Sequence, residues 1–236
     1  GKVRYCFSTA ASMAAETVRQ WKEQTGLKIY EGYGMTEAAP VVTYNHYYRH
    51  VIGSVGTAAP GVEIQIRDQQ GHELEPGVEG EICVRGQNIM MGYLNNPEAT
   101  RAAFWEKSWF RSGDIGRFDP NGYLYIVDRL KDMIITGGEN VYPKEVEDVL
   151  YCRPEIEECA VIGLADPDWG EKVTAFIVAR RDEEIDPVAL KAFLKTRIAA
   201  FKVPKEFRII NELPKNAAGK IQKRQLKKAL FSELPG

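Results

Sequence analysis

Lys220 follows a glycine in the stretch "PKNAAGKIQKRQLKKAL", residues 214–230, where turn-forming residues give way to a basic, helix-like run. A lysine in such a place is usually a solvated surface cation. It could also be a cation brought to an active site, where it would offset negative charge that builds up in a transition state. The run "KRQLKK", residues 223–228, predicts a solvated helix face rather than a nucleic-acid patch.

A second stretch whose residues could take part in chemistry is "EGYGMTEAAP", residues 31–40, in which two glycines flank Tyr33. A strand that ends in a glycine turn lets backbone and short polar groups approach a phosphate. The hydroxyl of Thr36 beside the carboxylate of Glu37 could serve a phosphate oxygen and its Mg²⁺, and Tyr33 could stack on a base. Taken alone, the stretch fits an ordinary strand-to-loop turn better than a phosphate site.

The third stretch is "WFRSGDIGRFDPNGYLYIVDRLKDMIITGGENVYPKEVE", residues 109–147. Asp114 is predicted to lie in a Ser-Gly-Asp turn, where its carboxylate could accept two hydrogen bonds from a ribose diol. The charged run "DRLKD" (128–132) separates two apolar strands, which is unusual for a purely structural segment. "TGGEN" (136–140) offers bare backbone that a ligand or another chain could approach closely.

Four motifs in this order carry a family resemblance: "YGMTE", "WFRSGD", "DRLKDMIITGGENVYPKEVE" and "PKNAAGK". The chain resembles the adenylate-forming superfamily of acyl- and aryl-CoA synthetases, luciferases and peptide-synthetase adenylation domains. The resemblance covers essentially all 236 residues, and four motifs in order are far more specific than any one alone.

The resemblance implies a nucleotide site. In it Tyr33 would lie beside adenine, Thr36 would contact the α-phosphate, and Glu37 would be the carboxylate for Mg²⁺. Asp114 would clamp the ribose, with Arg129 as its partner. The other residues implied to line the nucleotide are Glu31, Gly32, Ala10 and Ala11.

The resemblance also implies a CoA path and a moving domain. Lys220 would bridge carboxylate and phosphate during adenylation, Lys131 would be the hinge between the two domains, and Gly138 would line the pantetheine tunnel. Contacts with the nucleotide end of CoA would come from Trp169 in "DPDWGE" and from Phe201 and Lys205 in "FKVPK". The implied reaction uses ATP, Mg²⁺ and CoA: an acid becomes acyl-AMP, and the acyl group then passes to the CoA thiol.

One family feature is missing from this sequence, namely the Ser/Thr/Gly-rich phosphate loop that lies well upstream of "YGMTE". We therefore expect the chain to be a piece of a longer ligase and to be inactive alone. Two alternatives remain open: a short natural paralogue that binds nucleotide without catalysis, and an adenylation domain that loads a carrier protein. Trp169 and "FKVPK" modestly favour CoA. The acid is undetermined, although small residues in "GYGMTEAAPVV" weakly favour an apolar acyl group, as in fatty acid metabolism.

The elements that must position these motifs change along the chain. Residues 2–8 and 27–34 read as strands around a helix at 12–26, with Ser12 as N-cap and Gly26 after the last turn, which predicts a parallel pair. Residues 62–86 and 114–130 read as antiparallel hairpins. After residue 130 the pattern is α+β, with helices opened by Pro143 and by Asp186-Pro187.

We therefore expect an α/β plus α+β chain. Residues 1–128 would be the C-terminal portion of a large AMP-binding domain with a β-rich subdomain, and 129–236 a small, mobile α+β domain. The formal net charge of −2 gives no reason to expect nucleic acid or anionic membrane as a partner, and no run is apolar enough to span a bilayer.

Cysteine and histidine usage adds little specific chemistry. Cys6, Cys83, Cys152 and Cys159 form no CxxC pair, and Cys6 and Cys83 read as buried reduced thiols in strands. The opening residues lack the apolar core of a signal peptide, so we expect a cytoplasmic protein. His46 and His50 have no third ligand nearby, so no zinc site is expected there.

Overall fold

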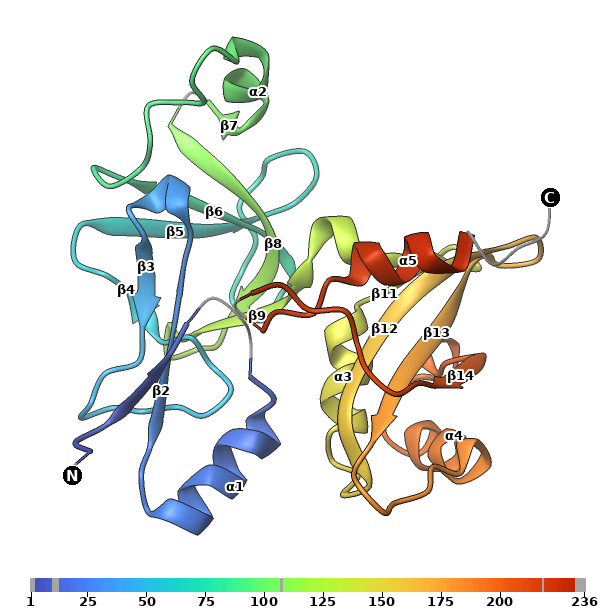
Figure 1. Cartoon of the computed structure of the whole chain (residues 1–236). Coiled ribbons are helices and arrows are strands. Elements are labelled where there is room, and N and C mark those ends of the chain that lie inside the picture. Colours follow the sequence, from blue (N-terminus) through green and yellow to red (C-terminus); the bar gives the residue numbers. More distant parts are fainter. Residues whose placement is uncertain (1–2, 10–12, 107, 218, 232–236) are drawn as a thin grey trace. The chain divides into compact units, whose positions relative to one another are not determined.

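The structure is a computed structural model, and it describes residues 3–9, 13–106, 108–217 and 219–231 (Figure 1). The chain divides into two compact units, Gly1–Leu130 and Lys131–Gly236. The boundary predicted from the sequence lies two residues earlier, between 128 and 129. The two units are described separately.

The first unit opens with a four-stranded sheet. Its elements are β1 (Cys6–Ser8), α1 (Ala15–Thr25), β2 (Ile29–Gly34), the short helix η1 (Thr36–Ala38), β3 (Val41–Tyr44) and β4 (Thr57–Ala58). Strands β1 and β2 pair in parallel, which confirms the prediction from the strand–helix–strand pattern. Strands β3 and β4 continue the sheet in antiparallel fashion, in the order β1-β2-β3-β4.

Helix α1 ends where the sequence predicts but begins later. Gly26 has a φ of 72°, and its N–H donates to the Lys22 carbonyl of the last turn at 2.9 Å, as expected for a glycine that ends a helix. Ala14 occupies the N-cap position, so the prediction of Ser12 as N-cap is wrong; Ser12 itself lies outside the described residues. Glu16 in the first turn complements the positive end of the helix instead.

The rest of the first unit is a five-stranded antiparallel sheet. Its elements are β5 (Val62–Arg67), β6 (Gly80–Gly86), α2 (Pro97–Ala102), β7 (Phe104–Trp105), β8 (Trp109–Phe118) and β9 (Leu124–Arg129). The order is β5-β6-β8-β7, with β9 paired to β8, so both predicted hairpins are confirmed. Side chains from the two sheets share one core, whose buried members are Ala38, Val42, Val55, Ile66, Ile82, Val84 and Leu124.

The second unit is an α+β domain around one five-stranded sheet (Figure 1). Its elements are β10 (Ile134–Thr136), β11 (Glu139–Val141), α3 (Pro143–Leu150), β12 (Ile156–Asp166), β13 (Gly170–Ala179), α4 (Pro187–Lys195), η3 (Ala200–Lys202), β14 (Glu206–Ile209) and α5 (Lys223–Phe231). The order is β11-β10-β13-β12, and β14 joins β13 in parallel. Pro143 and Pro187 open α3 and α4, and the Asp186 carboxylate caps α4, as predicted.

Strand β12 separates two cores because neighbouring side chains point to opposite faces of the sheet. Cys159 and Val161 belong to a core that includes residues of α3 and α4. Ala160 and Ile162 belong to a second core, which Leu226 of α5 helps to close. No helix in the described part of the chain is long and apolar enough to cross a membrane.

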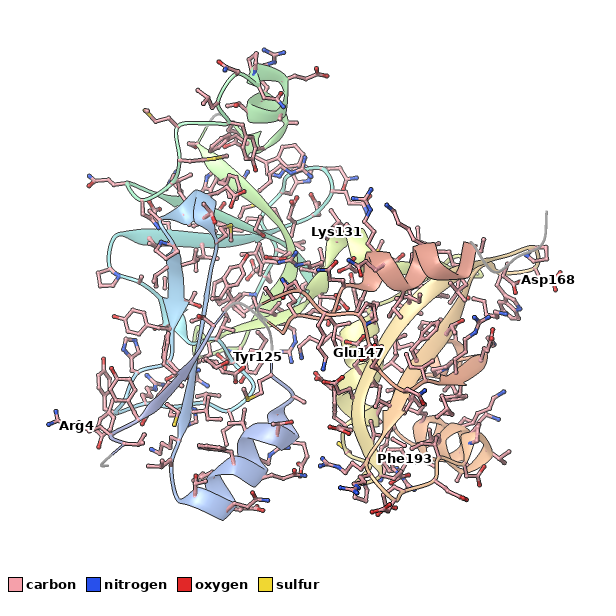
Figure 2. The ribbon with its side chains drawn as sticks, in the orientation of Figure 1. Arg4, Tyr125, Lys131, Glu147, Asp168 and Phe193 are labelled. Atoms are coloured by element: carbon pink, nitrogen blue, oxygen red, sulfur yellow. The ribbon has the colours of Figure 1, made fainter. Side chains whose placement is uncertain are left out.

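Helix α5 is not the fully solvated face that the basic run 223–228 predicts. Leu226 is buried in the second core, and Lys223 and Lys227 form ion pairs with Glu147 of α3 and Glu171 of β13, at 2.7 and 3.4 Å. Glu147 is labelled in Figure 2. The prediction is therefore wrong for this face, because lysines spaced four residues apart lie on the same side of a helix as the leucine between them.

Candidate nucleotide and acyl-transfer site

In the first unit the hydroxyl of Tyr33 donates a 2.7 Å hydrogen bond to Oδ2 of Asp114. The guanidinium of Arg129 lies 3.3 Å from Oδ1 of the same carboxylate. The hairpin places these charges together, because Asp114 and Arg129 are opposite each other in the β8–β9 pairing. Burial and the Asp114 charge raise the pKa of Tyr33 well above 10.0, so its hydroxyl stays a donor.

Asp114 does not lie in the turn that the sequence predicts. It lies inside β8, which is distorted at Gly113, where φ is 70°. The carboxylate of Glu81 on β6 accepts a hydrogen bond from the Gly113 N–H at 3.2 Å, and Ser112 Oγ accepts one from the Asp114 N–H at 3.0 Å. The neighbouring strand therefore supplies the partner of Gly113, whereas the partner of the Asp114 N–H lies two residues away in the same strand.

Glu31 and Gly32, both predicted to line the nucleotide, are buried in β2. A Cβ on Gly32 would lie 2.8 Å from the Phe7 ring and 3.0 Å from the Thr43 carbonyl oxygen, so close packing requires glycine here. Ala10 and Ala11, also predicted to line this site, lie outside the described residues.

Thr36 and Glu37 lie in η1, on a tight turn between β2 and β3. The turn needs Gly34, because a Cβ there would lie 1.8 Å from the Pro40 carbonyl oxygen. Thr36 is exposed, and the Glu37 carboxylate accepts a 3.1 Å hydrogen bond from the hydroxyl of Tyr93. Sequence reasoning missed Tyr93, since no local pattern pairs it with a residue 56 positions earlier.

Glu37 suits one particular kind of metal site. Among the described residues, no group of three or more His, Cys, Asp or Glu side chains could hold a metal ion by itself. Magnesium in nucleotide sites is commonly bound by one or two carboxylates, with phosphates and water completing the octahedron. A single carboxylate beside an exposed threonine fits a cation that arrives with its nucleotide.

In the second unit, three residues predicted to contact CoA meet at one end of the sheet. The Gly137 N–H donates to the Trp169 carbonyl at 2.8 Å. A Cβ on Gly137 would lie 3.1 Å from the Trp169 ring, so the indole lies beside the turn that contains Gly138. The ammonium of Lys205 lies 4.3 Å from the centre of the Trp169 ring. Phe201, the fourth, is half-buried and packs against the core of α3 and α4.

Lys220 sits in a closed turn of the second unit. The Lys220 carbonyl accepts from the Asn216 N–H, and the Lys220 N–H donates to the side-chain Oδ1 of Asn216, both at 2.9 Å. Lys215 and Ile221 pair as an isolated bridge across the turn. Lys131, predicted to be a hinge, is exposed and is the first residue of the second unit (Figure 2).

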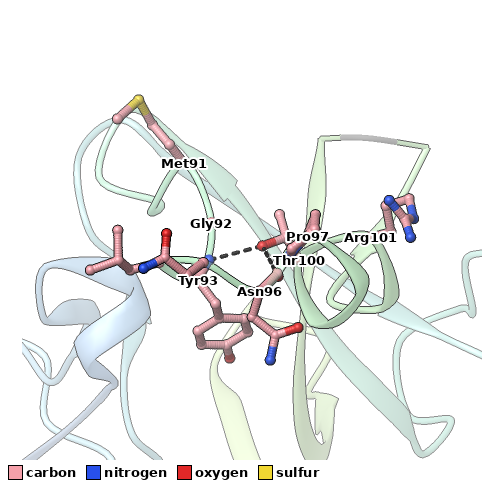
Figure 3. Close-up of a pocket in the computed structure, with 9 residues that line it drawn as sticks. Met91, Gly92, Tyr93, Asn96, Pro97, Thr100 and Arg101 are labelled. Carbon is pink, nitrogen blue, oxygen red and sulfur yellow. Dashed lines mark hydrogen bonds between the residues drawn. The ribbon is translucent and has the colours of Figure 1, made fainter.

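A separate open surface pocket of about 540 Å³ lies between Met91 and Arg101 (Figure 3). None of the predicted site residues lines it. The loop of residues 91–96 and helix α2 form this pocket.

Two family models match this chain. The model of the "AMP-binding enzyme" family matches residues 1–94, and the model of the "AMP-binding enzyme C-terminal domain" matches residues 145–220. The chain belongs to the AMP-binding enzyme family. The chain order of the two models agrees with the order of the motifs, and the family resemblance read from the sequence is confirmed.

Relatives within the AMP-binding family carry different names. A feruloyl-CoA synthase of Amycolatopsis sp is 45% identical over 205 residues, which is 86% of this chain and 42% of the relative. A long-chain-fatty-acid–CoA ligase of Bacillus subtilis (strain 168) is 41% identical over 226 residues, 95% of this chain and 40% of the relative. The chain therefore spans less than half the length of these relatives.

The fold also agrees with a solved member of the family. The ATP-bound structure of MatB from Rhodopseudomonas palustris matches with a TM-score of 0.92 and 40% identity, over 96% of this chain and 45% of that chain. The predicted α/β plus α+β fold class is confirmed.

Proposed function

We propose that this chain supplies the ribose-clamping and lysine-bearing part of an ATP-dependent acid–thiol ligase, an AMP-forming acyl-CoA synthetase. The observation that carries the proposal is the Asp114 carboxylate, held between the Tyr33 hydroxyl and Arg129 at the end of the β8–β9 hairpin. A carboxylate fixed in this way is a suitable acceptor for the two hydroxyls of a ribose.

In the first half-reaction an acid oxygen attacks the α-phosphorus of ATP, and the bond to pyrophosphate breaks. Asp114 holds the ribose, Tyr33 lies beside adenine, and Thr36 donates to an α-phosphate oxygen. Lys220 places one positive charge where carboxylate and phosphate meet, which offsets the charge that builds up in the transition state. Mg²⁺, bound by Glu37 and the phosphates, would supply further charge neutralisation.

In the second half-reaction the CoA thiol loses its proton and attacks the acyl carbon, and AMP leaves. The Trp169 indole and the Lys205 ammonium offer a flat apolar surface and a positive charge, which suit the adenine and phosphates of CoA. Gly138 has no side chain and a φ of 84°, and a Cβ there would meet no atom within 4 Å, so the backbone is open to a narrow ligand. Lys131 would act as the hinge that exchanges Lys220 for Gly138 between the two steps.

Acids of more than one chemical class are compatible with this proposal. The names of the two relatives refer to an aromatic and a long-chain fatty acid. Exposed Val41 and Pro40 beside η1 favour an apolar acyl group, and a fatty acid is one such group. The four cysteines are free, which suits a cytoplasmic enzyme.

ATP–pyrophosphate exchange by the whole protein tests the proposal. We expect exchange with at least one acid from a panel of aromatic, dicarboxylic and straight-chain acids, followed by CoA-dependent release of AMP. No exchange with any acid, or acyl transfer to a carrier protein but not to CoA, would contradict it. The 236-residue chain alone should show no exchange, because it lacks the phosphate loop.

A further inference from the structure

The segment from Asn88 to Tyr93 holds the Glu37 turn at several points. Asn88 Nδ2 donates to the Ala38 carbonyl at 2.8 Å, and the Met90 N–H donates to the Glu37 carbonyl at 2.8 Å. The Tyr93 hydroxyl then reaches the Glu37 side chain itself, at 3.1 Å from Oε1. Backbone and side chain of the same glutamate are thus fixed by one neighbouring segment.

Tyr93 is in turn fixed by the start of α2 (Figure 3). Its N–H donates to Thr100 Oγ1 at 2.9 Å, and Thr100 Oγ1 donates to the Asn96 carbonyl at 2.9 Å. Gly92 allows this approach, because a Cβ there would lie 2.6 Å from the Thr100 methyl carbon. The Asn96 side chain accepts from the Ala99 N–H at 3.0 Å and so caps α2. The ring is therefore anchored at its backbone end by a chain of hydrogen bonds.

We propose that Tyr93 is a positioning residue for the cation carboxylate of Glu37. This inference rests on the proposed function, in which Glu37 binds Mg²⁺ together with the phosphates. A glutamate side chain has several rotatable bonds, and a hydrogen bond to Oε1 restricts them and sets the direction of the whole carboxylate. Residues that hydrogen-bond a metal ligand commonly change metal affinity or activity 10- to 100-fold when they are replaced.

The decisive variant is Tyr93→Phe, which removes the hydroxyl and keeps the ring. Tyr123→Phe is the matched control, because its hydroxyl donates a bond of the same 3.1 Å length to the Arg49 carbonyl in the same unit, away from Glu37. The first readout is Mn²⁺ binding by the whole protein in the presence of ATP, followed by electron paramagnetic resonance. The second is the Mg²⁺ concentration that half-activates ATP–pyrophosphate exchange.

We expect Tyr93→Phe to weaken Mn²⁺ binding and to raise the half-activating Mg²⁺ concentration by about 10-fold or more, with Tyr123→Phe unchanged in both. In a Glu37→Ala background, Tyr93→Phe should add no further loss, because the tyrosine acts through that carboxylate. Equal effects of the two tyrosine variants, or full additivity with Glu37→Ala, would overturn the inference while leaving the proposed function intact. A wild-type protein that neither binds Mn²⁺ with ATP nor exchanges pyrophosphate would overturn both.

Discussion

The hydroxyl of Tyr33 and the carboxylate of Asp114 are joined by a 2.7 Å hydrogen bond between residues 81 positions apart. It connects the end of β2 in one sheet to the middle of β8 in the other. Arg129 approaches the other oxygen of Asp114, so the carboxylate is oriented from two sides. A group held in this way needs little reorganisation when a ligand hydroxyl arrives.

Replacing Asp114 with Ala should therefore raise the KM of the whole enzyme for ATP by about 10- to 100-fold, since a hydrogen bond to a charged group contributes about 1.5–3 kcal/mol. The KM for the acid should change much less. Steady-state pyrophosphate exchange at varied ATP checks both values. Asp182→Ala is the control, because Asp182 is a highly exposed carboxylate in the second unit. An unchanged KM for ATP in Asp114→Ala would show that Asp114 does not bind the ribose.

The Asn216–Lys220 turn gives a second prediction. Asn216→Ala removes the Oδ1 that accepts from the Lys220 N–H, so the lysine loses a fixed backbone. We expect a loss of about 10- to 100-fold in adenylation, because small misplacements of a catalytic group are costly. Thioester formation from supplied acyl-AMP should be nearly unchanged, and Asn216→Asp, which keeps an acceptor oxygen, should recover most of the loss. Asn211→Ala, at an exposed position nearby, serves as the control.

Helix α5 offers a test by stability. Leu226 is 7% exposed, so Leu226→Ala should lower the free energy of unfolding by about 2–3 kcal/mol, near the low end for buried leucines. Lys228→Ala, on the exposed side of the same helix, should change it by less than about 0.5 kcal/mol. Urea unfolding followed by circular dichroism measures both variants. Equal stabilities would mean that α5 does not close the second core.

The thiols give a prediction that depends on pH. Burial and the charge of Glu81 raise the pKa of Cys83 to about 12, and burial raises that of Cys159 well above its usual range, whereas Cys152 is exposed. At pH 8 only about one Cys83 in 10⁴ would be thiolate, the reactive form. Ellman's reagent should therefore modify Cys152 quickly and reach Cys83 and Cys159 only in urea.

The raised thiol pKa values also set the sign of an effect on stability. Above pH 9 the unfolded chain loses thiol protons that the folded chain keeps, so stability from these groups is present below pH 9 and is lost as the pH rises toward 12. Fast labelling of all four cysteines at pH 8 without urea would contradict the assigned burial.

Features set by local sequence were predictable. Gly26 at the end of α1, Pro143 at the start of α3 and the turn at Asn121-Gly122 depend on dihedral preferences that act within a few residues. The order of the four motifs was sufficient to predict the family and the fold class. Phe201, Trp169 and Lys205 were placed by resemblance alone, and their proposed contacts with CoA stay predictions.

Features set by distant contacts were not predictable. The local Ser-Gly-Asp pattern predicted a turn at Asp114, but β8 continues through this residue because it pairs with β6 and β9, which are distant in sequence. Lys223 and Lys227 read as solvated because their carboxylate partners are on α3 and β13, far away in sequence. Tyr93 was not predicted as a site residue for the same reason, since only the folded chain brings its hydroxyl to Glu37.

The exchange of Lys220 for Gly138 between the two steps is tested by measuring the two half-reactions separately on two variants of the whole enzyme. Lys220→Ala should lower adenylation by about 10²–10³-fold, the range for one preorganised electrostatic donor, and nearly spare thioester formation from supplied acyl-AMP. Gly138→Leu should do the reverse. Gly122→Leu controls for backbone strain, because Gly122 has a similar φ of 79° and, like Gly138, open space around it. If Lys220→Ala and Gly138→Leu depress both half-reactions equally, the two residues do not take turns at one site, which contradicts the proposed exchange.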